Sequence, residues 1–392
     1  DDPAGEVRRR GRPFPNGESS EMTKPFSAGQ VATEEAILRL ILDRGGSPDA
    51  DLIREIIATA LKLVEDKTSR GDLKIINSAL KEMRYAFKVF APYRHIRKVT
   101  IFGSSRIGEE RPEYRQARAF ARGVGEVGFM VITGAGDGIM KAGQEGAGRE
   151  RSFGVNIRLP FEQRANSIIE GDEKLIQFKY FFTRKLIFAK ETDAIALFPG
   201  GFGTLDEAFE ILTLAQTGKS QPLPIVLVDA PGGSYWREWE GFLRRQIRDR
   251  GMISPQDVNL FRITDRAKEA VDEVAGFYRN YHSSRYVQDG RLVIRHLVPL
   301  PDEVLARLQA EFADILVDGT IERNGPHQDE MNEPELADLP RLILRFNRRD
   351  FGRLRRLIDA LNAAVAEPAA AEVGAAPPRR VARRGSDGLS HQ

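Results

Sequence analysis

Residues 194–212 read AIALFPGGFGTLDEAFEIL, an apolar run, a glycine-rich turn and an amphipathic segment in succession. The apolar run Ala194–Phe198 is typical of a buried strand, and the segment 204–217 has helical spacing. Glycine lacks a Cβ atom, so its backbone approaches an anion closely. A helix that begins after such a turn directs free N–H groups and the positive end of its dipole at that anion. The stretch therefore predicts a phosphate-binding strand–turn–helix unit.

The same alternation of apolar runs and amphipathic segments extends along the chain from Val99. The expected strands are Val99–Phe102, Phe129–Thr133, Phe153–Ile157, Leu175–Phe178, Ala194–Phe198, Ile225–Val228 and Phe261–Thr264. The expected helices are 112–126, 138–149, 181–190, 204–217, 234–249 and 265–280. Near-continuous apolar strands that alternate with helices indicate a parallel sheet covered on both faces. We therefore predict an α/β protein with a Rossmann-like, doubly wound parallel sheet.

Other patterns divide the rest of the chain. Three helical patterns, at about 34–43, 47–64 and 72–90, predict a helical extension before the sheet. The two ends of the chain are rich in Gly, Pro, Ala and Arg without periodicity, which is typical of disorder. We therefore predict a disordered arm (1–30), a helical extension (31–95), a Rossmann-like nucleotide-binding domain (96–280), a small α+β accessory domain (281–365) and a disordered tail (366–392).

The accessory domain is predicted from two apolar runs and two helical patterns. The expected strands are Leu292–Val298 and Leu342–Phe346, and the expected helices are Asp302–Ile315 and 350–364. Their succession indicates a ferredoxin-like type. A basic set in this domain has two interpretations, a solvated helix face or a grip on a phosphorylated effector. Its members are Arg348, Arg349, Arg353, Arg355 and Arg356.

Composition excludes several classes of protein and site. The 59 Lys and Arg residues nearly balance the 57 Asp and Glu residues, which argues against a nucleic-acid partner. The chain has no cysteine, so disulfides, thiol nucleophiles and Cys-ligated zinc are excluded. Its five histidines form no H-E-x-x-H pair, so we expect no metal. No apolar run approaches the ~18 residues of a membrane span, so we expect a soluble, cytoplasmic protein without a membrane partner.

Three glycine-rich turns follow predicted strands, at the carboxyl ends where open α/β sheets bind ligands. They comprise residues 102–106, 133–140 and 198–207. Ile139 interrupts a G-x-G-x-x-G fingerprint in the second turn, which disfavours NAD. The third turn has no lysine after Gly203, as a P-loop would, which disfavours ATP hydrolysis. We therefore expect no cofactor.

One combination around the third turn is more specific. The motif Pro199-Gly200-Gly201-x-Gly203-Thr204-x-x-Glu207 follows Arg184-Lys185, with Arg184 23 residues before Glu207. This combination resembles the Lonely Guy (LOG) family of phosphoribohydrolases, which cleave nucleoside 5′-monophosphates and are often labelled lysine decarboxylases. The resemblance covers about residues 98–265 and is closer to the longer subgroup. Phe182 and Ala135 depart from the family pattern of His and Gly, and both departures concern the base preference.

The resemblance implies that Arg184 and Glu207 are the catalytic pair. Cleavage of a ribose–base bond develops positive charge on the sugar, and a carboxylate beside the ribose offsets that charge. The guanidinium of Arg184 has a planar fork of donors that suits phosphate, ribose or the leaving base. Which of the two residues contacts the base stays open. The residues implied to bind phosphate and ribose are Gly103, Ser104, Ser105, Gly134, Gly136, Gly138, Asn156, Lys185, Pro199, Gly200, Gly201, Gly203, Thr204 and Glu210.

The expected activity is hydrolysis of the N-glycosidic bond of a nucleoside 5′-monophosphate, of the AMP or cytokinin riboside 5′-monophosphate type. The expected products are the free base and ribose 5-phosphate. The resemblance also implies a homodimer or a higher homo-oligomer. One alternative is a non-catalytic nucleotide or molybdenum-cofactor carrier or sensor. Another is an amino-acid decarboxylase in which Lys185 holds pyridoxal phosphate, although the sequence shows no pocket for that cofactor.

Overall fold

The computed structural model describes residues 28–158 and 164–365. The predicted arm, as far as residue 27, and the predicted tail lie outside the described residues. The chain divides into two compact units, Asp1–Asn77 and Ser78–Gln392, which are described separately. Helix α3 (Arg70–Phe90) runs through the boundary between them.

The first unit contains α1 (Ala28–Asp43), α2 (Ala50–Glu65) and the start of α3, so the three predicted helices are present. α1 packs against α2 and buries Ile37 and Ile41. α2 itself has no buried residue, and apolar side chains at helical spacing, such as Ile56 and Val64, are exposed. Within the first unit, the apolar stripe of α2 therefore remains exposed.

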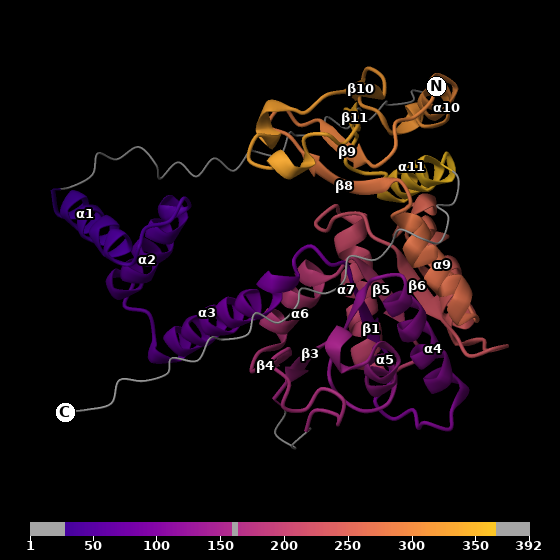
Figure 1. Ribbon diagram of the computed structural model, residues 1–392, viewed down its shortest axis with the longest axis horizontal. Helices are drawn as coiled ribbons and strands as arrows, with labels where there is room; N and C mark the ends of the chain where they lie inside the picture. The colour runs from indigo at the N-terminus through magenta and orange to yellow at the C-terminus, as the bar shows by residue number, and fades with distance from the viewer. Residues whose placement is uncertain (1–27, 159–163, 366–392) are drawn as a thin grey trace, which may run out of the picture. The chain divides into compact units, whose positions relative to one another are not determined.

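Seven parallel strands form the main sheet of the second unit, as the apolar runs predict (Figure 1). They are β1 (Lys98–Phe102), β2 (Met130–Thr133), β3 (Ser152–Ile157), β4 (Leu175–Phe178), β5 (Ala194–Leu197), β6 (Ile225–Val228) and β7 (Phe261–Thr264). Their spatial order is β4-β3-β2-β1-β5-β6-β7. The order reverses between β1 and β5, so the sheet is doubly wound and its switch point lies between these strands. The predicted Rossmann-like α/β fold is confirmed.

Helices cover both faces of this sheet. They are α4 (Pro112–Glu126), α5 (Ile139–Ala147), α6 (Phe181–Glu191), α7 (Phe202–Gln216), α8 (Tyr235–Phe242), which continues as a π-helix over Leu243–Arg248, and α9 (Ala267–Phe277). Successive strand residues point to opposite faces. In β2, Val131 joins a core with α4, α5 and α9, whereas Ile132 joins a core with α6, α7 and α8. Two apolar layers therefore fix the strands, and the polar turns begin where the strands end.

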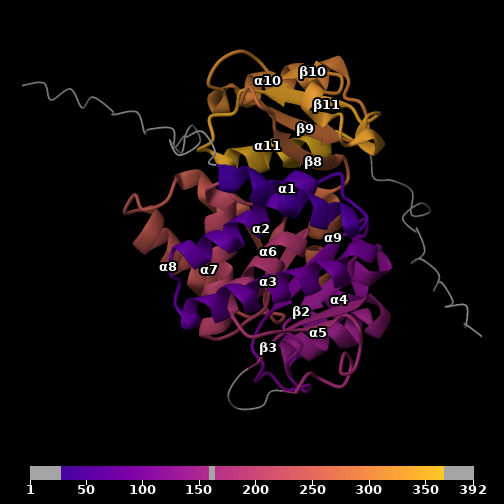
Figure 2. The same cartoon turned by 90° about the vertical axis from the view of Figure 1, so that its left-hand side faces the viewer.

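The C-terminal part of this unit is an antiparallel sheet. It comprises β8 (Tyr281–Tyr286), β9 (Leu292–His296), β10 (Glu322–Asn324) and β11 (Arg341–Leu344), in the order β10-β11-β9-β8, with α10 (Asp302–Glu311) and α11 (Phe351–Ala363). α11 contacts β8 as well as α7 and α9 (Figures 1 and 2). The predicted strand–helix–strand–helix succession is incomplete, because the chain order is strand–strand–helix–strand–strand–helix. The sequence pattern missed β8 and β10 because both strands are mostly polar.

Candidate active site

The three glycine-rich turns meet at the switch point of the sheet. The N–H of Ser104, after β1, donates a hydrogen bond to the carbonyl oxygen of Pro199, after β5, at 3.1 Å. The N–H of Ile139, after β2, donates to the carbonyl oxygen of Ser104, also at 3.1 Å. The first turn is therefore bonded to both of the others. Ligands of open α/β sheets bind at this position.

The second turn is held by side chains beneath it. Thr133 Oγ1 accepts a hydrogen bond from the N–H of Ala135, whose φ is 61° where the LOG pattern has glycine. Asn166 Nδ2 donates to the carbonyl oxygen of Gly136 at 2.8 Å and to Gln144 Oε1 at 2.7 Å. Asn166 and Gln144 are buried, so this network fixes the turn without exposing polar atoms.

Gly138 brings the second turn against the first. Its φ is 63°, and a Cβ atom there would lie 2.3 Å from the carbonyl oxygen of Ser104. Gly148 is a matched control, because its φ is 78° but no atom lies within 4 Å of an added Cβ. Backbone strain of about 1–2 kcal/mol is common to both alanine variants. We expect Gly138→Ala to lower the free energy of unfolding by at least about 2 kcal/mol more than Gly148→Ala, because only the Cβ at position 138 also collides with the first turn. Urea denaturation of the two variants measures this difference, and equal losses would contradict the interpretation.

The third turn presents unpaired backbone donors at the N-terminus of α7. Within the described residues, the N–H groups of Gly201, Phe202 and Gly203 donate no hydrogen bond, whereas that of Thr204 donates to the carbonyl oxygen of Gly201. A Cβ at Gly200 would lie 2.1 Å from Thr204 Oγ1, so internal packing requires glycine there. A Cβ at Gly201 or Gly203 would meet no atom within 4 Å. Packing does not explain these two glycines, but close approach of a ligand does.

Arg184 projects from α6 to the second turn. Its Nε donates to the carbonyl oxygen of Val155 in β3 at 2.9 Å, and its guanidinium lies over the ring of Phe188. A Cβ at Gly134 would lie 2.6 Å from its Nη2 atom. Burial lowers the pKa of Arg184, and the nearby carboxylate of Glu207 opposes that shift. Asn156, the neighbour of Val155, is buried at the carboxyl end of β3.

Glu207 is the buried carboxylate of the site. It lies in the second turn of α7 and is 8% exposed. Lys185 Nζ approaches Glu207 at 3.3 Å, Asp206 at 2.9 Å and Glu210 at 2.6 Å, and thus ties α6 to α7. Burial raises the pKa of Glu207, while Lys185 and then Arg184 oppose the shift. Lys185 therefore neutralises carboxylates of its own chain in this structure.

Comparisons with known proteins agree with this geometry. Residues 134–274 match the family model described as possible lysine decarboxylase. Over 94 residues, the chain is 33% identical to the Arabidopsis thaliana cytokinin riboside 5′-monophosphate phosphoribohydrolase LOG1, covering 24% of this chain and 42% of that protein. Over 102 residues, it is 35% identical to the Mycobacterium tuberculosis enzyme of the same name, covering 25% and 51%. The resemblance to the LOG family is confirmed.

These LOG proteins match only part of the chain, and the chain spans about two fifths of the length of the first plant relatives. An Oryza sativa relative named probable LOG4 matches at 25% identity over 186 residues, which cover 46% of this chain and 76% of that protein. Among solved structures, the Chlamydomonas reinhardtii molybdenum cofactor carrier protein is 15% identical, with a TM-score of 0.32 over 46% of this chain and 96% of that one. That score is too low to support an argument about function.

The structure places the LOG-type residues predicted from the sequence at one edge of the sheet. The first turn holds Gly103, Ser104 and Ser105, and the second holds Gly134, Gly136 and Gly138. The third turn and α7 hold Pro199, Gly200, Gly201, Gly203, Thr204, Glu207 and Glu210. Arg184 and Lys185 reach this edge from α6, and Asn156 from β3. Sequence patterns missed Asn166, Gln144 and Tyr235, whose hydroxyl donates to the carbonyl oxygen of Gly200 at 2.7 Å, because no motif includes them.

The decarboxylase alternative conflicts with the environment of Lys185. An amine that forms a Schiff base must lose its proton. Burial lowers the pKa of Lys185, but Glu210 and Asp206 accept its hydrogen bonds, and the net effect holds the pKa well above its ordinary value. Among the described residues, no cluster of His, Asp or Glu side chains is suited to hold a metal, and no helix is long and apolar enough to cross a membrane.

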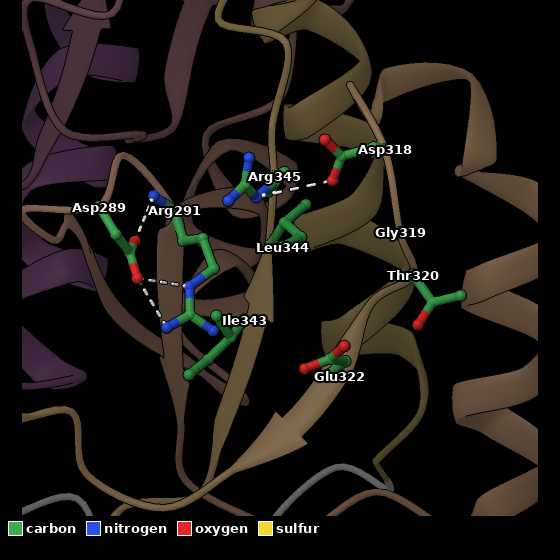
Figure 3. Close-up of a pocket in the computed structure, with 9 residues that line it drawn as sticks. All are labelled: Asp289, Arg291, Asp318, Gly319, Thr320, Glu322, Ile343, Leu344 and Arg345. Atoms are coloured by element: carbon green, nitrogen blue, oxygen red, sulfur yellow. Dashed lines mark hydrogen bonds and ion pairs between the residues drawn. The ribbon is translucent and has the colours of Figure 1, made fainter.

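A cavity of about 320 Å³ lies elsewhere, on the antiparallel sheet (Figure 3). It is lined by Asp289, Arg291, Asp318, Gly319, Thr320, Glu322, Ile343, Leu344 and Arg345. Both arginines have aspartate partners, Arg291 with Asp289 at 2.7 Å and Arg345 with Asp318 at 3.5 Å. No predicted LOG-type residue lines this cavity, so it is separate from the candidate active site.

Four of the five arginines of the basic set, Arg348, Arg353, Arg355 and Arg356, are engaged within the chain. Arg353 forms two hydrogen bonds with Asp314, and buried Arg355 pairs with Asp359 and Glu273. Arg356 approaches Asp359 at 3.7 Å, and the Arg348 guanidinium lies over the ring of Tyr286. These contacts favour the interpretation of a helix face with ordinary ion pairs over that of an effector grip.

Proposed function

We propose that this protein hydrolyses the N-glycosidic bond of a nucleoside 5′-monophosphate, of the AMP or cytokinin riboside 5′-monophosphate type, to the free base and ribose 5-phosphate. The observation that carries the proposal is the buried carboxylate of Glu207, on the helix whose N-terminus presents unpaired N–H groups. The match to proteins named cytokinin riboside 5′-monophosphate phosphoribohydrolase supports the same chemistry.

The substrate phosphate would bind at the third turn. The donors available there are the N–H groups of Gly201, Phe202 and Gly203, with the hydroxyl of Thr204 close by. At 1.5 Å per helical residue, Glu207 lies about 6 Å along α7 from Gly203. That distance suits a carboxylate that binds the ribose hydroxyls of a nucleotide held by its 5′-phosphate.

In the reaction, the C1′–N bond breaks and its electron pair leaves with the base. A water oxygen bonds to C1′, and one proton of that water ends on the base. The sugar carries positive charge between these events, and the carboxylate of Glu207 stabilises it. Arg184 is fixed by Val155 beside the second turn, where its remaining donors meet phosphate, ribose or base. Lys185 positions Glu207, and the proposed chemistry uses no cofactor or metal.

The test compares nucleotides with nucleosides. The purified protein is incubated with AMP, GMP, CMP, UMP and the four matching nucleosides, and free base is measured by chromatography. The proposal expects base from one or more monophosphates and none from the nucleosides. Equal release from a nucleotide and its nucleoside would contradict a role for the phosphate. A nucleotide bound without release would favour the carrier or sensor instead.

The acid limb of the pH profile is a second test, because the mechanism requires ionised Glu207. Burial raises the pKa of Glu207, and the positive charge of Lys185 is the main influence that lowers it. Loss of Lys185 should therefore raise the pKa of Glu207 further. We expect Lys185→Met to move the acid limb of kcat/KM to higher pH. Lys190→Met is the matched control, because Lys190 pairs with Glu191 outside the site. A limb that stays in place in Lys185→Met would contradict the assignment.

We also propose that the protein forms a homodimer or a higher homo-oligomer that covers the face beside this site. Phe181, Phe182 and Leu186 on α6 are about half exposed, and Phe202 at the start of α7 is 96% exposed. An apolar surface of this kind is typical of an interface. Light scattering should give a molar mass at least twice the 43.9 kDa of one chain, and a single-chain mass would contradict the proposal.

A further inference from the structure

We infer that Tyr235 is a positioning residue for phosphate binding: its hydroxyl holds the Gly200–Gly201 peptide in the orientation that aims the Gly201 N–H at the ligand. The inference rests on the proposed function, since it concerns the same third turn. Tyr235 Oη donates to the carbonyl oxygen of Gly200 at 2.7 Å.

The geometry of a peptide group makes this contact directional. In a trans peptide, the carbonyl of one residue and the N–H of the next point in opposite directions. The sheet order puts β5 between β6 and β1 (Figure 1). Tyr235 follows β6, so the Gly200 carbonyl points to the β6 side. The Gly201 N–H therefore points to the β1 side, where Ser104 of the first turn lies.

Without such a contact, this peptide would be free to rotate. A peptide flip exchanges two turn conformations that differ in the dihedral angles of the two flanking residues. Gly200 and Gly201 flank this peptide, and glycine tolerates the angles of both conformations. A flip would turn the Gly201 N–H away from the first turn and direct a carbonyl oxygen at the phosphate. It would also leave the half-buried Tyr235 hydroxyl without its acceptor.

Tyr235 is itself held firmly. It is the first residue of α8, and its ring packs edge-on against Trp236 with centroids 4.8 Å apart. Trp236 is fully buried, and its backbone N–H donates to the carboxylate of Asp229 at 3.0 Å. Burial raises the pKa of Tyr235, so the phenol remains a donor at neutral pH. The hydroxyl therefore reaches Gly200 from a fixed support.

The test uses Tyr235→Phe, which removes only the hydroxyl. Tyr278→Phe is the matched control, because the Tyr278 hydroxyl also donates to a backbone carbonyl, that of Asp193, at the opposite end of β5. We expect Tyr235→Phe to weaken ribose 5-phosphate binding, measured by calorimetry, by about 5–10-fold. The KM for the hydrolysed nucleotide should rise by the same factor with kcat nearly unchanged, because the phosphate contact is equal in ground and transition states.

The outcomes separate this inference from the proposed function. Ribose 5-phosphate binding to Tyr235→Phe as tight as to the wild-type protein would overturn the inference, even if the wild-type enzyme is active. A weakened Tyr278→Phe, or a fall in kcat of Tyr235→Phe without a rise in KM, would also overturn it, because a general structural loss would then explain the data. Wild-type protein that binds ribose 5-phosphate but hydrolyses no nucleotide would contradict the proposed function alone. Wild-type protein that neither binds ribose 5-phosphate nor hydrolyses any of the nucleotides would overturn both.

Discussion

Glu207→Gln is expected to lower kcat for nucleotide hydrolysis by at least about 1,000-fold, or about 4 kcal/mol of transition-state stabilisation. The amide has the shape of the carboxylate but no charge to offset the positive sugar. Because burial raises the pKa of Glu207, its ionised form destabilises the folded state relative to a neutral group. The free energy of unfolding of Glu207→Gln at pH 7 should therefore equal or exceed that of the wild-type protein.

Glu191→Gln is the matched control for this variant. The Glu191 side chain is 9% exposed and that of Glu207 is 10% exposed, and each pairs with a lysine. Glu191 ends α6 at the amino end of β5, away from the glycine-rich turns. Single-turnover rates of Glu191→Gln should stay within a few-fold of wild type. A Glu207→Gln enzyme that retains more than about a tenth of wild-type kcat would exclude Glu207 as the catalytic carboxylate.

Gly203→Ala is expected to lower kcat/KM for the nucleotide by about 100-fold without loss of stability. A helical Cβ tilts toward the N-terminus of its helix, so the added methyl group would enter the space proposed for the phosphate. No atom of the described chain lies within 4 Å of that position, and alanine favours a helix over glycine by up to about 1 kcal/mol. Binding should therefore weaken while the free energy of unfolding stays equal or rises.

Gly201→Ala should behave in the same way, since its φ of −89° suits alanine and its added Cβ also meets open space. Steady-state kinetics and urea denaturation of each variant measure the two effects separately. If both alanine variants bind and hydrolyse the nucleotide like the wild-type protein, the phosphate does not lie at the N-terminus of α7. If both unfold more easily, an internal contact explains these glycines instead.

The centre of the main sheet was predictable because its strands are buried on both faces. Such strands are continuous apolar runs, and Ile225–Val228 has the predicted bounds. The order of the strands placed the glycine-rich turns at one edge. The polar strand Tyr281–Tyr286 and the exposed strand Glu322–Asn324 gave no such signal, so these two strands of the accessory sheet were missed.

The sequence predicted which side chains form the site, but not which of them contact one another. Arg184 and Glu207 were found from a motif, and the structure brings both to the glycine-rich turns. The engagement of Lys185 with three carboxylates depends on how α6 packs beside α7, which spacing along the chain does not reveal. The same holds for Asn166 and Tyr235, which act on backbone groups through hydrogen bonds.

The departures from the LOG pattern have different structural consequences. Ala135 adopts a φ of 61° and is buried, where glycine would be unstrained. Its N–H donates to Thr133 Oγ1 and its carbonyl oxygen accepts from the N–H of Asn166, and these two hydrogen bonds hold it there. Phe182 is 54% exposed and stacks on Tyr180 with ring centroids 5.5 Å apart. Only the second departure changes an exposed surface beside the proposed site.

The most direct test of the central claim is the stoichiometry of the products. Wild-type protein and Glu207→Gln are each incubated with AMP, and adenine and ribose 5-phosphate are quantified together by chromatography and mass spectrometry, with further monophosphates examined in parallel. The account predicts base and ribose 5-phosphate in a 1:1 ratio from at least one monophosphate with the wild-type protein, and neither product above background with Glu207→Gln. Monophosphates that bind to the wild-type protein but remain intact would contradict it.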